Sequence, residues 1–99
     1  MTINLENFYK VLINNQIDFF TGVPDSLLKS ICKYISDYAP EGRHVISANE
    51  GTSIALATGY YLATNKIPLI YMQNSGLGNA INPLISLADK MFVSICLAL

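Results

Sequence analysis

Three short segments of this sequence carry the residue types that a catalytic or binding site needs. They are Gly22-Val-Pro-Asp-Ser26, Asn49-Glu50-Gly51 and Gln73-Asn-Ser-Gly-Leu-Gly78. Each segment precedes a helical pattern, so each offers backbone N–H groups and the positive end of a helix dipole, which suit an anion or a polar planar ligand. Because Glu50 follows an apolar strand, its carboxylate is expected in the crevice at the carboxyl ends of the strands, where ligands usually bind.

Simpler interpretations of the same residues stay open. Asp25 and Ser26 are typical helix N-caps, and Glu50 in a first helical turn can serve only to compensate the helix dipole. The glycines of Gly76-Leu-Gly78 are weak evidence for a dinucleotide site, because Ile81 stands where the third glycine of that fingerprint belongs.

The elements that must position these segments alternate along the chain. Helical spacing predicts helices over 4–15, 27–35 and 51–63 and a last one ending near Asp89, either kinked at Pro83 or newly begun there with Asn82 as cap. Apolar runs predict strands over 17–23, 44–48, 67–73 and 92–97. Almost wholly apolar strands that alternate with helices indicate an α/β fold, a doubly wound parallel sheet with helices on both faces.

Composition limits the partners and the compartment. The 99 residues make one domain at most, 52% of them hydrophobic and 13% charged, so some faces are expected to be covered by another copy in a homo-oligomer. A net charge of −1 gives no electrostatic case for nucleic acid or an anionic membrane. Cys32 and Cys96 resemble small buried hydrophobes, the single His44 has no partner at metal-ligand spacing, and no signal peptide is visible. The chain is therefore expected to be cytoplasmic.

A stripe of small residues runs along the third predicted helix. Ala55, Gly59 and Ala63 recur every fourth residue, so another backbone can approach closely there. Packing onto the chain's own sheet and contact with another subunit explain the stripe equally well.

Four segments together resemble the pyrimidine-binding domain of thiamine diphosphate-dependent decarboxylases. They cover residues 20–28, 48–52, 57–64 and 71–80. Within that family the resemblance is greatest to the phosphonopyruvate decarboxylase branch, with the sulfopyruvate decarboxylase alpha subunit next. It extends to Asp89, after which the sequence departs from the family pattern. The resemblance implies a flavodoxin-like sheet, with residues 1–99 forming part of that domain and ending after the fourth strand.

The resemblance also implies roles for individual residues. Glu50 corresponds to the glutamate that hydrogen-bonds N1′ of the cofactor's aminopyrimidine, where a carboxylic acid favours the imino form of the ring. The pyrimidine pocket would be lined by Val23, Pro24, Gln73 and Asn74. Asp25 and Ser26 would point towards the substrate or take part in proton transfer.

By this likeness, the enzyme would decarboxylate a 2-keto acid, with phosphonopyruvate the first choice, giving phosphonoacetaldehyde and CO2. Thiamine diphosphate would be the cofactor, and its diphosphate and Mg²⁺ would be bound by a domain absent from this chain, which has no Gly-Asp-Gly motif. The chain alone would then be inactive. Two alternatives remain: a sulfopyruvate decarboxylase alpha-type subunit working with a separate diphosphate-binding chain, and a non-catalytic oligomerising or ligand-binding module.

Overall fold

The structure is a computed structural model that describes residues 4–26, 28–89 and 96–98. Its elements follow the order helix, strand, helix, strand along the chain. They are α1 (Leu5–Asn14), β1 (Phe20–Gly22), α2 (Lys29–Tyr38), β2 (His44–Ile46), α3 (Glu50–Thr64), β3 (Leu69–Tyr71), η1 (Asn74–Gly76), α4 (Leu77–Pro83), η2 (Leu84–Asp89) and β4 (Cys96–Ala98). This order confirms the expected alternation, although each strand is shorter than its apolar run.

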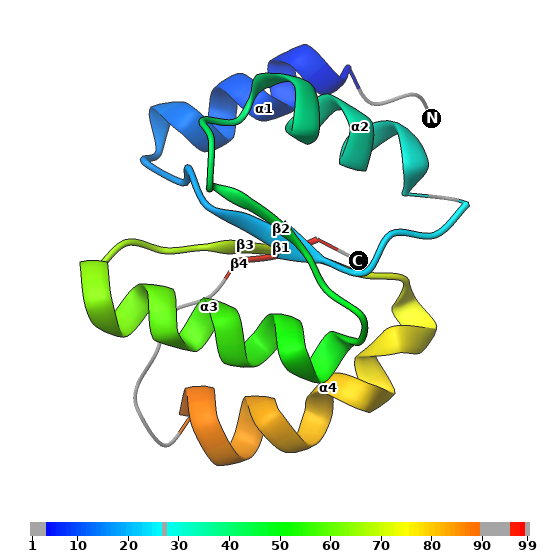
Figure 1. Ribbon diagram of the computed structural model, residues 1–99, viewed down its shortest axis with the longest axis vertical. Helices are drawn as coiled ribbons and strands as arrows, with labels where there is room; N and C mark the ends of the chain where they lie inside the picture. Colours follow the sequence, from blue (N-terminus) through cyan, green and yellow to red (C-terminus); the bar gives the residue numbers. More distant parts are fainter. Residues whose placement is uncertain (1–3, 27, 90–95, 99) are drawn as a thin grey trace.

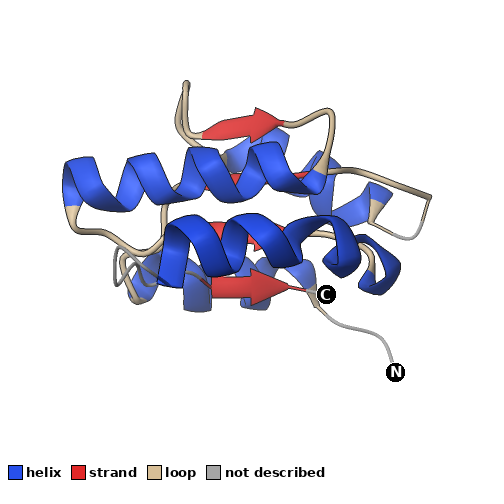
Figure 2. Cartoon of the chain, turned by 90° about the horizontal axis from the view of Figure 1, so that it is seen from below, coloured by secondary structure: helices blue, strands red, loops and turns tan. Residues whose placement is uncertain are grey.

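The four strands form one parallel sheet in the order β2-β1-β3-β4. Phe20 of β1 lies between His44 of β2 and Leu69 of β3, and Leu69 pairs in turn with Cys96 of β4. Helices α1 and α2 cover one face of this sheet, and α3 and α4 cover the other (Figure 1). The view in Figure 2 shows the strands lying side by side in the layer between the helices. The predicted doubly wound α/β sheet is confirmed. Of the predicted fourth strand, residues 92–95 lie outside the described residues.

Each face of the sheet carries its own apolar core. Under α1 and α2 the buried cluster comprises Leu12, Phe20, Ile35, Leu69 and Tyr71. Under α3 and α4 it comprises Ile54, Ala57, Ile70, Met72 and Ala80. Because successive strand residues point to opposite faces, β3 supplies both clusters, which explains why its run has no polar alternation.

Asparagine residues form helix ends in two places. Asn4 accepts a hydrogen bond from Asn7 N at 3.1 Å, and Asn65 ends α3 in the left-handed conformation with φ 60°. At α2 the expectation that Asp25 or Ser26 caps the helix is wrong, because the N-cap is Leu28. Asp25 Oδ1 accepts from Leu28 N at 2.8 Å, but the helix begins only at Lys29, so Asp25 stabilises the turn that leads into it.

The region around Pro83 follows the first of the two alternatives. Pro83 is the last residue of α4, and the chain continues without a break into η2, a π-helical segment. Asn82 does not cap a new helix; its carbonyl accepts from Ser86 Oγ at 2.8 Å. Since proline has no N–H to donate, a wider turn at this point keeps the helix continuous.

The small-residue stripe does not pack against the sheet. Ala55, Gly59 and Ala63 are all exposed, and a Cβ added at Gly59 would meet no atom within 4 Å. The sheet side of α3 is formed instead by Ser53, Ile54, Ala57 and Thr58. Packing onto the chain's own sheet is therefore the wrong explanation, and the subunit contact stays a prediction. Among the described residues, no helix is long and apolar enough to cross a membrane.

Candidate functional site

The three segments singled out in the sequence lie side by side at the carboxyl edge of the sheet. They follow β1, β2 and β3, and β1 lies between the other two strands. Backbone hydrogen bonds fix neighbouring segments to one another: Ser47 N donates to Gly22 O at 2.9 Å, and Val23 N donates to Tyr71 O at 3.3 Å. The side chains of Thr21 and Ser47 add a buried contact of 3.0 Å. This edge is on the right of Figure 1.

Glu50 is the first residue of α3 and is partly exposed at this edge. Asn49 caps the helix, because its Oδ1 accepts from Thr52 N at 2.9 Å. The carboxylate of Glu50 reaches across to α4, where Asn79 Nδ2 donates to Oε2 at 3.3 Å. The acid is therefore held between two helix starts, α3 after β2 and α4 after β3.

Gly76 makes room for this carboxylate. A Cβ added at Gly76 would lie 2.5 Å from Glu50 Oε1 and 3.0 Å from Cδ and Cγ. Only a glycine therefore lets the Glu50 side chain lie in its observed place. Gly76 therefore leaves space for Oε1 of Glu50, while Asn79 donates to Oε2.

The residues expected to line the pyrimidine pocket lie on the two flanking segments. Val23 is half-buried after β1, while Pro24, Gln73 and Asn74 are exposed at the same edge. Gln73 O accepts from Gly76 N at 2.8 Å, which shapes the turn beneath Glu50. Their position is compatible with the expected role, and no described contact joins their side chains to Glu50.

Asp25 and Ser26 belong to a separate hollow at this edge. A cavity of about 450 Å³ lies between the segment after β1 and the first turns of α2. Its lining residues are Pro24, Asp25, Ser26, Lys29, Cys32 and Lys33. The structure therefore brings Asp25 and Ser26 together with α2 side chains, and Glu50 together with Gly76 and Asn79.

A chain of polar contacts fixes the Cys32 wall of this cavity to the core. Tyr71 OH donates to Cys32 Sγ at 3.5 Å and lies 2.7 Å from His44 Nε2, and His44 Nδ1 lies 2.9 Å from Ser36 Oγ. Burial raises the pKa of Tyr71 well above its usual range, and the contact with Cys32 raises it further. Burial also lowers the pKa of His44. Both groups are therefore neutral near pH 7. Cys32, expected to be a small buried hydrophobe, is half-buried instead.

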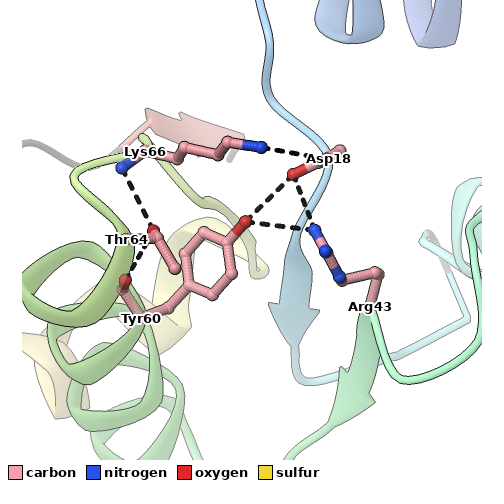
Figure 3. A network of polar contacts seen from close by, with 5 residues as sticks. All are labelled: Asp18, Arg43, Tyr60, Thr64 and Lys66. Atoms are coloured by element: carbon pink, nitrogen blue, oxygen red, sulfur yellow. Dashed lines mark hydrogen bonds and ion pairs between the residues drawn. The ribbon is translucent and has the colours of Figure 1, made fainter.

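A second polar network anchors α3 at the opposite edge of the sheet (Figure 3). Asp18 Oδ1 lies 3.1 Å from Arg43 Nη1 and accepts from Tyr60 OH at 3.0 Å, and Lys66 Nζ lies 3.8 Å from Asp18 Oδ2. Arg43 also donates to Tyr60 OH at 3.3 Å. These contacts join residues before β1, β2 and β3 to the last turns of α3. Because α3 is fixed here, Glu50 at its other end has a defined position.

Four residues at this edge escaped the sequence reasoning. Lys29 and Lys33 carried no motif, and Gly76 and Asn79 belonged to the segment 71–80 without a role of their own. Lys29 and Lys33 could have been noticed from their spacing, since they lie one helical turn apart at the start of the predicted helix. The approach of Gly76 and Asn79 to Glu50 has no local signal, because it joins segments 26 and 29 residues apart.

Among the described residues, no group of His, Cys, Asp and Glu side chains could hold a metal ion. At the carboxyl edge, the described residues bring together the Glu50 carboxyl group with Gly76 and Asn79, and place a cavity lined by Asp25, Lys29 and Lys33 after β1.

Comparison with known proteins assigns this chain to a family. The model of the family described as "Thiamine pyrophosphate enzyme, N-terminal TPP binding domain" matches residues 5–98. The chain belongs to this family. The match extends past Asp89, where we expected the family pattern to end. Membership of the family supports thiamine diphosphate as the cofactor.

Individual members of the family and solved structures agree with this assignment. Sulfopyruvate decarboxylase subunit alpha of Methanococcus maripaludis is 40% identical over 82 residues, which are 83% of this chain and 48% of that subunit. A Mycobacterium smegmatis structure, described as a thiamin diphosphate-dependent enzyme, superposes with a TM-score of 0.74 at 26% identity over 90% of this chain and 17% of its own. Benzoylformate decarboxylase from Polynucleobacter necessarius, 22% identical, shares the fold with a TM-score of 0.81 over 98% of this chain and 18% of its own.

Two points follow from these comparisons. The chain spans about half the length of the curated alpha subunits that it matches. Those relatives are named for sulfopyruvate, so the first expectation of phosphonopyruvate gains no support from them.

Proposed function

We propose that this chain supplies the pyrimidine side of the active site in a thiamine diphosphate-dependent 2-keto acid decarboxylase, with sulfopyruvate as its substrate. The observation that carries the proposal is the Glu50 carboxyl group, held by Asn79 and seated over Gly76 where the segments after β1, β2 and β3 meet. Family membership supports the cofactor, and the names of the relatives support sulfopyruvate over phosphonopyruvate.

Thiamine diphosphate, when bound, supplies the nucleophilic carbon and the electron sink that loss of CO2 from a 2-keto acid requires. Glu50 would hold the cofactor's ring by presenting a proton at Oε1 to N1′, while the Asn79 amide keeps Oε2 in place. Val23, Pro24, Gln73 and Asn74 would flank the ring and exclude water from it. Asp25 and Ser26 would face the substrate or move a proton to it.

The remaining half of the site would come from elsewhere. A diphosphate-binding domain or subunit would hold Mg²⁺ and the diphosphate, and the chain by itself would be inactive. The name "subunit alpha" of the relatives supports a separate partner chain. Association with further copies of this chain is part of the same proposal.

The test is Glu50→Gln in the assembled protein supplied with thiamine diphosphate and Mg²⁺. Loss of the ionisable proton should lower CO2 release from 3-sulfopyruvate by about 100-fold or more. Glu41→Gln is the matched control, because Glu41 is an exposed turn residue and should keep full activity. Phosphonopyruvate assayed alongside decides between the two head groups.

Full decarboxylation by Glu50→Gln would overturn the proposal. Glu50 would then be a helix-dipole charge, and the alternative of a non-catalytic module would gain.

A further inference from the structure

The cavity beside the catalytic edge has a cationic wall that the proposed chemistry at Glu50 does not use. Its volume of about 450 Å³ lies within the range of about 300–1,000 Å³ of small-molecule sites. It opens where β1 ends at Gly22, and β1 pairs with both β2 and β3. The segments that carry Glu50 and Asn74 follow these two neighbouring strands at the same edge of the sheet.

Two lysines, Lys29 and Lys33, and one acid, Asp25, line this cavity. Lys33 Nζ forms an ion pair of 2.8 Å with Asp37, a residue that does not line the cavity. Asp25 directs Oδ1 to Leu28 N at 2.8 Å. Lys29 lies within 4.0 Å of no carboxylate among the described residues, which leaves its ammonium group available to an anion.

The backbone around Lys29 also favours the binding of an anion. Lys29 is the first residue of α2, and the N-cap Leu28 offers no side chain to the free N–H groups of the first turn. Those groups and the helix dipole favour negative charge at the same place. The cavity wall at Cys32 is held in place, because Tyr71 OH donates a hydrogen bond to Cys32 Sγ and Tyr71 belongs to the buried cluster under α1 and α2.

We propose that this cavity holds the strongly acidic head group of the substrate, a sulfonate or phosphonate, and that Lys29 recognises it. The inference rests on the proposed function, since it assigns the head group of the same 2-keto acid. The substrate's keto carbon would then lie towards Glu50 and its charged head towards α2. Lys29 thereby becomes the residue that distinguishes a doubly charged 2-keto acid from one with an uncharged tail.

The experiment compares Lys29→Met, Lys29→Arg and the exposed control Lys10→Met in the assembled protein. Lys29→Met should raise KM for 3-sulfopyruvate by about 10- to 100-fold and change KM for 2-oxobutanoate by less than about twofold, because only the former has an acidic head. Lys29→Arg should restore most of the loss, and Lys10→Met should behave like the unaltered protein. Phosphonopyruvate, run in parallel, shows which acidic head the cavity prefers. An equal effect of Lys29→Met on the charged and uncharged substrates, or none on either, would overturn the inference.

A binding measurement separates this inference from the proposed function. Sulfoacetate has the two acidic groups without the keto carbon, so its affinity in titration calorimetry does not depend on turnover. Binding that weakens at least tenfold in Lys29→Met and falls with added salt supports the cavity even if no 2-keto acid is decarboxylated. Absence of binding, or equal affinity in both proteins, would refute the cavity while leaving the role of Glu50 intact.

Discussion

The space at Gly76 leads to a substitution that should separate activity from stability. Gly76 has φ −70° and ψ −18°, a right-handed helical conformation that alanine adopts without strain. The three atoms nearest to an added Cβ all belong to the side chain of Glu50, with Oε1 2.5 Å away. Because that atom is the end of a flexible side chain, Gly76→Ala should move the carboxyl group and leave the backbone in place.

The size of the effect follows from this distance. An ordinary contact is 3.4 Å or longer, so Oε1 must retreat by about 0.9 Å. This movement of the carboxyl group also weakens the hydrogen bond that Asn79 Nδ2 donates to Oε2. A displacement of about 1 Å in a catalytic constellation can cost about 100-fold in rate. Stability should move the other way, since glycine to alanine at a compatible position raises the free energy of unfolding by about 0.4–1 kcal/mol.

The assay pairs CO2 release by the assembled protein with thermal unfolding of the same preparation. Gly78→Ala is the matched control, because Gly78 lies two residues further on, in the first turn of α4, and its added Cβ would meet no atom within 4 Å. Gly78→Ala should keep full activity, while Gly76→Ala loses about 100-fold and remains at least as stable. If Gly76→Ala is as active as Gly78→Ala, the position of the Glu50 carboxyl group does not matter and the reasoning fails.

Two further predictions concern the rest of the fold. Asp18→Asn should lower the free energy of unfolding by about 1–2 kcal/mol in urea titrations, because Arg43 and Lys66 lose a partly buried carboxylate. Glu6→Gln, in an exposed pair, should show no measurable loss, and equal losses in both variants would contradict the role of the network. His44, the single histidine, has a pKa lowered by burial, so the unfolded chain binds its proton more readily and stability should fall as the pH drops below about 6.5. Urea midpoints at pH 5 and pH 7 measure this fall, which should be smaller in His44→Gln; an unchanged fall would refute the assignment to His44.

The sequence was sufficient wherever the signal was local. The alternation of apolar runs with helical spacing determined the parallel sheet, because strands buried on both faces cannot carry polar alternation. Asn4 and Asn65 marked helix ends, since a cap depends on residues only three or four positions away. The position of Glu50 after a strand placed it correctly at the carboxyl edge.

Tertiary structure decided what depends on distant segments. The sequence showed Gly76 as a turn glycine, and only packing of α3 against α4 made it the cradle of the Glu50 carboxyl group. From the sequence, the small residues around Gly59 could face either the chain's own sheet or another subunit. Because Ile54 and Ala57 are buried and Gly59 is exposed, the small residues lie on the side of α3 that faces away from the sheet. Asp18 gave no sign of its partners, because three strands and a helix must first assemble to bring them within hydrogen-bonding distance. Residue types thus set the chemistry that this edge can perform, whereas the packing of segments far apart in the chain set where each group lies.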